Sequence, residues 1–164
     1  MEITPKIIEH PQILVIGVPF YGSPDNGQFA KVWDLSNKIN AHIPHQREPA
    51  TYYGVEAYPE KFRTEGKWFY LAGVEVTSLE AIPVQLVGKV LPAHQYAVFT
   101  HHGALPGKLH ATFQYAYQTW LPQSSYVQAA PYDFERYDAR FLGADNEQSV
   151  MEVWIPIILA AEKA

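Results

Sequence analysis

The stretch V-M-E-V-W-I-P-I, residues 150–157, carries a single charged group in an otherwise apolar segment. An ionised carboxylate is costly in apolar surroundings unless something pairs with it. Strand alternation predicts that Glu152 and Trp154 share one face, while the opposite face is wholly aliphatic. A glutamate beside an indole suits an aromatic-walled pocket in which the carboxylate meets a cationic ligand.

The sequence leaves two interpretations of Glu152 open. In the first, Glu152 is the countercharge of a ligand pocket on the face away from the helices. In the second, it lies in water at a sheet edge or pairs with a nearby Arg or Lys, since structural ion pairs also perturb carboxylates.

Aromatic residues are unusually frequent, with 11 Tyr, 8 Phe and 4 Trp in 164 residues. Such side chains line ligand pockets and also fill cores. The alternation of segment 68–76 does not decide which face lines a groove, because both alternating sets are apolar. Glu75 could lie at the rim of a groove, but we predict a solvated strand-end acid. Glu135 is predicted to be a surface ion-pair partner.

Metal and catalytic motifs are weak. His42-x-x-His45 straddles a proline, and the adjacent His101 and His102 would point to opposite faces of a strand. Cysteine is absent, and no G-x-S-x-G element occurs. We therefore expect no metal, no cofactor and no catalytic residues.

The elements that must position these residues follow one order twice: strand, helix, strand, strand. The predicted segments are 13–20, 28–43, 51–58 and 68–76, then 95–101, 107–121, 126–133 and 149–157, with a further strand near 85–91. The halves lie about eighty residues apart, which is the signature of an internal repeat. We predict an α+β fold of two pseudo-symmetric β-α-β-β units, about 1–80 and 81–164, within one domain, 1–164. Antiparallel sheets would carry helices on one side and a ligand groove on the other.

The charge balance narrows the possible partners. With 12 Lys+Arg against 17 Asp+Glu, the formal net charge is −5, and no basic run is present. We therefore expect no direct nucleic-acid binding. The start M-E-I-T-P-K-I-I-E-H is not a signal peptide, and the longest apolar run, 153–161, is too short to span a bilayer. A cytoplasmic protein without membrane association is the expectation.

A set of ordered motifs resembles a known family. They are L-A-G-V-E-V (71–76), Y-A-V-F-T-H-H-G (96–103), W-L-P (120–122), D-F-E-R-Y-D (133–138) and M-E-V-W-I-P-I (151–157). Together they resemble the GyrI-like small-molecule-binding domain, the effector-binding module of certain AraC-type and MerR-type regulators. The resemblance implies two pseudo-symmetric β-α-β-β units around a groove for lipophilic, often cationic, aromatic compounds. It also implies a glutamate in the pocket floor, which the M-E-V-W-I-P-I match makes Glu152.

The chain shows no helix-turn-helix segment, so we expect a stand-alone form that acts as a receptor and not as an enzyme. The predicted ligand-binding residues are Glu152, Trp154, Tyr53, Trp68, Tyr96 and Tyr137. Two alternatives stay open, because stand-alone relatives include hydrolases of reactive natural products and a gyrase inhibitor. In the first, Glu152 would serve as acid or base toward a strained electrophile. In the second, a protein partner, gyrase or a regulator, would be bound.

Overall fold

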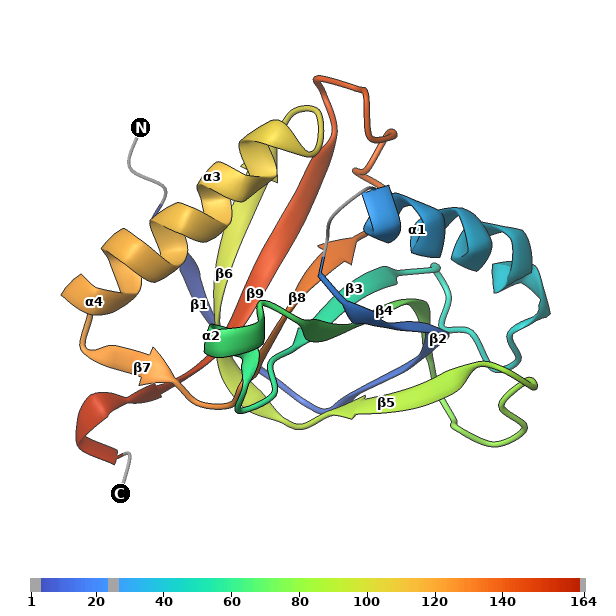
Figure 1. The fold of residues 1–164 in the computed structure, drawn as a ribbon, viewed down its shortest axis with the longest axis horizontal. Coiled ribbons are helices and arrows are strands. Elements are labelled where there is room, and N and C mark those ends of the chain that lie inside the picture. Colours follow the sequence, from blue (N-terminus) through green and yellow to red (C-terminus); the bar gives the residue numbers. More distant parts are fainter. Residues whose placement is uncertain (1–3, 24–26, 163–164) are drawn as a thin grey trace. The chain divides into compact units, whose positions relative to one another are not determined.

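The computed structural model describes residues 4–23 and 27–162, and the chain divides into two compact units. The N-terminal unit is Gln12–Pro92, and the C-terminal unit combines Ala93–Ala164 with Met1–Pro11. Both are built from antiparallel strands and helices, as the predicted α+β class requires (Figure 1). Within the described residues, no helix is both long and apolar enough to cross a membrane.

The N-terminal unit forms a sheet with the strand order β3-β4-β2-β5, in which all neighbours are antiparallel. Its strands are β2 (Ile13–Gly22), β3 (Tyr52–Ala57), β4 (Trp68–Val76) and β5 (Val87–Leu91). Its helices are α1 (Gln28–Ile39), followed by a 3₁₀ turn (Asn40–His42), and the single turn α2 (Phe62–Glu65).

Helix α1 packs on one face of this sheet. Val32 of α1 lies in a buried cluster with Tyr70 and Ala72 of β4. The hydroxyl of Ser36, also buried, donates to the backbone oxygen of Ala72 across 3.1 Å. A small hydrogen-bonding side chain lets the helix approach the strand without leaving the hydroxyl unsatisfied. Side chains of β4 that share the parity of Tyr70 therefore face α1.

The C-terminal unit has the strand order β1-β6-β9-β8, and β7 pairs with the far end of β9. Its strands are β1 (Lys6–His10), β6 (His94–His102), β7 (Tyr126–Gln128), β8 (Tyr132–Tyr137) and β9 (Val150–Leu159). Its helical elements are α3 (Gly107–Tyr115), a π-helical turn (Ala116–Trp120), α4 (Leu121–Gln123) and a final 3₁₀ turn (Ala160–Glu162).

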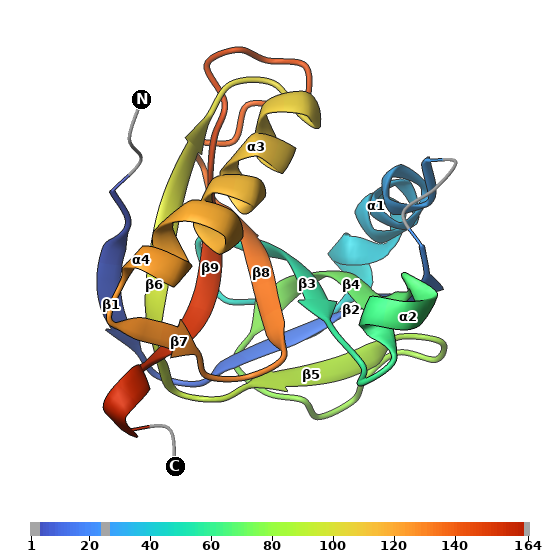
Figure 2. The same cartoon turned by 60° about the vertical axis from the view of Figure 1, so that its left-hand side comes forward.

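Helix α3 and the π-helical turn cover one face of this second sheet, and α3 runs alongside β6 in both views (Figures 1 and 2). Phe99 of β6 contacts the rings of Tyr115 and Trp120 with centroid distances of 6.4 and 5.4 Å. Phe99 is paired across the sheet with Val153 of β9, and Val153 is paired with Glu135 of β8. Directly paired residues project from the same face. Val153 and Glu135 therefore face the helices.

The outer strands β1 and β5 do not pair with the strands that directly follow them in sequence. β1 comes just before β2 in sequence but pairs with β6, and β5 comes just before β6 but pairs with β2. In each unit, one outer strand therefore comes from a segment that is adjacent in sequence to the other unit. The predicted division at residue 80 differs from the boundaries of the compact units, and a duplication origin stays a prediction.

Most predicted elements match, and the strand-helix-strand-strand order is present in both units. One strand prediction is wrong: the segment 126–133 contains all of β7 and the first two residues of β8, separated by residues 129–131. The amide of Ala129 still donates to the backbone oxygen of Pro156 on β9, but Pro131 has no amide hydrogen to donate and so interrupts the ladder before β8. D-F-E-R-Y is thus a strand, and Glu135 lies inside it. Strand β1 was not predicted.

Candidate functional site

Besides Glu9 of β1, four glutamates of the described residues lie on strands, and these four fall into two groups. Glu75 and Glu152 project from the faces opposite α1 and α3, because each alternates with helix-facing neighbours. Glu56 and Glu135 project toward the helices, because Glu56 is paired with Tyr70 and Glu135 with Val153. The first group is bound by arginines and the second by tyrosine hydroxyls.

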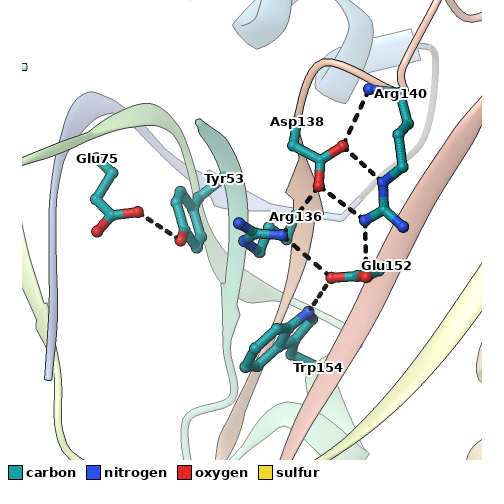
Figure 3. Close-up of polar contacts among 7 residues, drawn as sticks. All are labelled: Tyr53, Glu75, Arg136, Asp138, Arg140, Glu152 and Trp154. Carbon is teal, nitrogen blue, oxygen red and sulfur yellow. Dashed lines mark hydrogen bonds and ion pairs between the residues drawn. The ribbon is translucent and has the colours of Figure 1, made fainter. Parts of the chain in front are cut away.

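Glu152 lies in a network of charges (Figure 3). One carboxylate oxygen accepts from Arg140 across 2.8 Å, and the other accepts from the indole of Trp154 across 2.9 Å and from Arg136 at 3.3 Å. Asp138 bonds both arginines, at 2.7 and 3.1 Å. Two guanidinium groups thus face two carboxylates, and the guanidinium of Arg136 lies over the Trp154 ring.

This network fixes the ionisation of its acids. Burial alone raises the pKa of Glu152, but hydrogen bonds from Arg140 and Trp154 and the charges of both arginines outweigh it, so the pKa is below its usual value. The hydrogen bond from Arg140 lowers the pKa of Asp138 to about 2. At neutral pH both acids are charged, and their charge is already balanced. The structure therefore matches the second interpretation of Glu152, in which a protein cation pairs with it.

Glu75 has an equivalent arrangement in the N-terminal unit. It accepts from the hydroxyl of Tyr53 across 2.8 Å and pairs with Arg47 across 2.6 Å (Figure 3). Only 8% of the residue is exposed. The prediction of a solvated strand-end acid is therefore wrong, because Arg47 and Tyr53 enclose the carboxylate.

Aromatic rings gather around Trp154 on the face opposite α3. Trp154 stacks on Phe134 with centroids 5.5 Å apart, and the rings of Tyr96 and His10 meet it edge-on at 5.5 and 5.4 Å. Tyr96 is fully buried and Trp154 is 4% exposed. These are the exposures of core residues, so this part of the face is not open to a ligand in this structure.

Glu135 is buried on the helix side of the C-terminal unit, so the prediction of a surface position is wrong. The hydroxyl of Tyr137 donates to it across 2.8 Å. Two residues earlier on the same face, the fully buried Asp133 accepts from the hydroxyl of Tyr117 in the π-helical turn. Asp133, Glu135 and Tyr137 therefore share one face of β8, and Tyr117 reaches that face from the π-helical turn.

Glu56 occupies the matching position in the N-terminal unit. It is 8% exposed and accepts from the hydroxyl of Tyr58 across 3.1 Å. Five half-buried or buried rings surround this region, and we call them the Trp68 cluster: Phe29, Tyr58, Phe62, Trp68 and Tyr70.

The rings of the Trp68 cluster are in mutual contact. Phe29 stacks on Tyr70 with centroids 4.1 Å apart and meets Trp68 edge-on at 5.7 Å. Phe62 meets Trp68 at 5.5 Å and Tyr58 at 4.8 Å. Because Phe29, Tyr58, Phe62 and Trp68 are each only partly buried, the cluster reaches the protein surface. A carboxylate beside partly exposed aromatic rings can receive a flat organic cation.

A cavity of about 450 Å³ lies elsewhere, between β6 and α3, and is lined by Thr100, His101, His102, Lys108, Ala111, Thr112 and Tyr115. Its charged lining group is the cation Lys108, so it does not suit a cationic ligand. Among residues 4–23 and 27–162, no group of three His, Asp or Glu side chains could hold a metal ion.

The six predicted ligand-binding residues are divided among four surfaces. Glu152, Trp154 and Tyr96 come together opposite α3, and Tyr53 lies opposite α1. Tyr137 and Trp68 are on the helix-facing sides, one in each unit. The residues that the predictions missed are mainly Glu56, Glu135 and the rings that contact Trp68.

Antiparallel strands with a helix on one face in each unit, and glutamates set among aromatic rings, define a GyrI-like α+β domain. The chain belongs to the family described as integron-associated effector binding protein, which it matches over residues 6–157. It is also 32% identical over 152 residues to the transcriptional regulator BrlR of Pseudomonas aeruginosa. That match covers 93% of the chain but only 54% of BrlR, so the chain spans about half the length of this relative.

Solved structures share the fold. The integron cassette protein VCH_CASS2, from the mobile metagenome of Vibrio cholerae, aligns with a TM-score of 0.67 and 18% identity, covering 93% of this chain and 95% of that one. The protein SAV2435, whose structure contains tetraphenylphosphonium, aligns with a TM-score of 0.74 and 17% identity, covering 96% and 94%.

Proposed function

We propose that this protein is a receptor for lipophilic aromatic cations, and that the Trp68 cluster with Glu56 forms the binding site. The observation that carries the proposal is a buried carboxylate beside partly exposed rings. Family membership supports an effector-binding role, and the tetraphenylphosphonium in SAV2435 supports a lipophilic cation as the ligand class.

Ring contacts and the carboxylate charge both contribute to the binding free energy of a cation. Each ring face that meets a cation contributes roughly 0.5–2 kcal/mol, more when the pair is desolvated. A carboxylate in a partly buried site attracts that cation more strongly than it would in water, because the local dielectric is lower. The hydroxyl of Tyr58 holds the Glu56 carboxylate in place as a neutral donor, so the hydrogen bond orients the group without removing its charge.

Glu152 and Glu75 have another role in this proposal. Their arginine partners compensate their charge, and together they hold strands and loops in place on the faces opposite the helices. The helix-facing Glu135 is the second candidate countercharge, because it has the same relation to Tyr137 that Glu56 has to Tyr58.

Calorimetric titration with tetraphenylphosphonium tests the site. We expect binding by the wild type and an affinity at least about tenfold lower for Glu56→Gln, in line with loss of one close charge. Glu152→Gln is the matched control and is expected to bind within about twofold of the wild type. Loss of binding in Glu152→Gln with retention in Glu56→Gln would move the site to the face around Trp154. Equal binding by Glu56→Gln, Glu135→Gln and Glu152→Gln would remove the electrostatic part of the proposal.

A further inference from the structure

Within the described residues, the indole nitrogen of Trp68 is a buried donor without a hydrogen-bond partner. An indole N–H can only donate, so it cannot be satisfied by a donor nearby. Buried indole groups usually find an acceptor, and an exception in a native structure requires an explanation. The position of this exception, inside the proposed binding site, suggests that the missing acceptor belongs to a ligand.

Other tryptophans of the chain do have acceptors. Trp33 of the same unit donates to the hydroxyl of Tyr70 across 2.7 Å, and Trp154 donates to Glu152 across 2.9 Å. The indole groups of Trp33 and Trp154 thus each have an acceptor within the protein. Trp68 differs from them because its ring neighbours are aromatic carbon surfaces.

The geometry of these neighbours explains why the donor is unsatisfied. The rings of Phe62 and Phe29 lie nearly perpendicular to the indole ring of Trp68, with interplanar angles of 89° and 76°. Tyr58, the third ring in contact with Trp68, uses its hydroxyl to donate to Glu56. The nitrogen is buried and has no acceptor among the described residues, and the two phenylalanine rings that contact the indole carry no oxygen.

Helix α2 is suited to move away from this donor. It has four residues, none of them buried, and it ends at Gly66 in the left-handed conformation. Its ring contacts with the cluster are made by Phe62, which packs on Tyr58 and Trp68. Displacing one turn held by one half-buried side chain exposes little apolar surface, so a ligand can replace Phe62 at small cost.

We propose that the ligand is an aromatic cation that also carries a hydrogen-bond acceptor, such as a carbonyl or ether oxygen, which accepts from Trp68 Nε1 when Phe62 moves aside. This inference rests on the proposed function and narrows its ligand class. The cation is held by Glu56 and the rings, while the acceptor satisfies the buried indole donor of Trp68. Selection among lipophilic cations then depends on the acceptor, because a cation without one leaves the indole unpaired.

A matched pair of probes tests this inference: (4-acetylphenyl)triphenylphosphonium, which has a carbonyl, and (4-isopropylphenyl)triphenylphosphonium, which has nearly the same shape and no acceptor. Calorimetry on the wild type should give an affinity about five- to tenfold higher for the acetyl compound, the usual gain from one buried hydrogen bond. In Trp68→Phe the ratio should fall to about one. Trp120→Phe, which alters a tryptophan of the other unit, should keep the wild-type ratio.

The outcomes separate the two proposals. If both probes and tetraphenylphosphonium bind the wild type but the two matched probes bind equally, the acceptor inference is overturned and the proposed function stands. If none of the three binds, both fall. The wild-type ratio is informative by itself, so the inference is tested even if Trp68→Phe does not fold.

Discussion

Glu56 and Glu135 hold the same position in their two units. Glu56 lies on β3, the first strand after α1, and Glu135 lies on β8, the second strand after α3. Each faces the helix of its unit, and each accepts from the tyrosine two residues further along the chain. The E-x-Y spacing is therefore a repeated structural device: a phenol from the same strand orients a buried carboxylate. Arginines perform the corresponding task for the glutamates on the opposite faces.

Removing these phenol hydroxyls should have unequal effects. Tyr137 is 6% exposed, so Tyr137→Phe removes a hydrogen-bond donor from a buried carboxylate and should lower the free energy of unfolding by about 1–2 kcal/mol. Tyr58 is only half-buried, and Tyr58→Phe should cost less than about 1 kcal/mol because water can replace the hydroxyl. Urea denaturation of both variants measures the difference, and equal losses would contradict this account.

The network around Glu152 should be stabilising as a unit. Arg136→Met removes one of two guanidinium groups from two partly buried acids and should lower the free energy of unfolding by about 1–3 kcal/mol. Lys108→Met is the matched control, because it breaks an ion pair with Glu147 whose partners are both more than 60% exposed, and it should cause no measurable change. Similar results for the two variants would show that the network does not stabilise the fold.

Acid should weaken the same network in a defined range. The pKa of Asp138 falls from 3.8 in the unfolded chain to about 2 in the folded protein. Its contribution is complete above the unfolded value and is lost as the pH falls from about 4 toward 2, since only the unfolded state takes up the proton there. Unfolding free energies measured between pH 6 and pH 2.5 should decline less steeply for Asp138→Asn than for the wild type.

His101 should cause a second loss of stability at milder acidity. Burial lowers its pKa below 6.5, and the nearby charges of His102 and Lys108 act in the same direction. A base with a lowered folded pKa is stabilising when neutral, so the contribution is complete above pH 6.5 and is lost as the pH falls below that value. The melting temperature of the wild type should fall between pH 7.5 and 5.5, and that part of the fall should be absent from His101→Gln.

Two glycines should respond oppositely to an added methyl group. A Cβ on Gly17 would lie 2.2 Å from the backbone oxygen of Ala72 on the paired strand, so Gly17→Ala should cost more than about 2 kcal/mol. At Gly107, the first residue of α3, no atom lies within 4 Å of the added Cβ. Gly107→Ala should leave stability unchanged or raise it by up to about 1 kcal/mol, through the unfolded state. Thermal melts of the two variants decide the point.

Local pattern was sufficient to predict most of the fold. The i, i+3/i+4 spacing located α1 and α3, and period-two alternation placed Glu152 and Trp154 on the face away from α3. Glu135 was misplaced because Pro131 breaks the segment just before β8, which made a strand resemble a polar surface run. Strand β1 was missed because its five residues carry no turn signal distinguishing it from an N-terminal arm.

The site was harder to predict because its partners come from distant segments. Arg136 and Arg140 reach Glu152 only because β8 pairs with β9, and no spacing within one strand encodes that pairing. Trp68 had two possible faces, since both alternating sets of β4 are apolar, and only its contact with Phe29 of α1 settles the question. Helix α2, which carries Phe62, has too few residues to show any period.

The pairing of β1 with β6 determines when β1 can fold during synthesis of the chain. The N-terminal unit is one continuous segment, so it can fold as soon as residue 92 has left the ribosome. β1 emerges before that unit, yet its partner β6 does not exist until about eighty residues later. Ile7 and Ile8 of β1 therefore have no strand partner until β6 has been synthesised. Strand β1 therefore precedes the N-terminal unit in the chain but can pair only after that unit is complete.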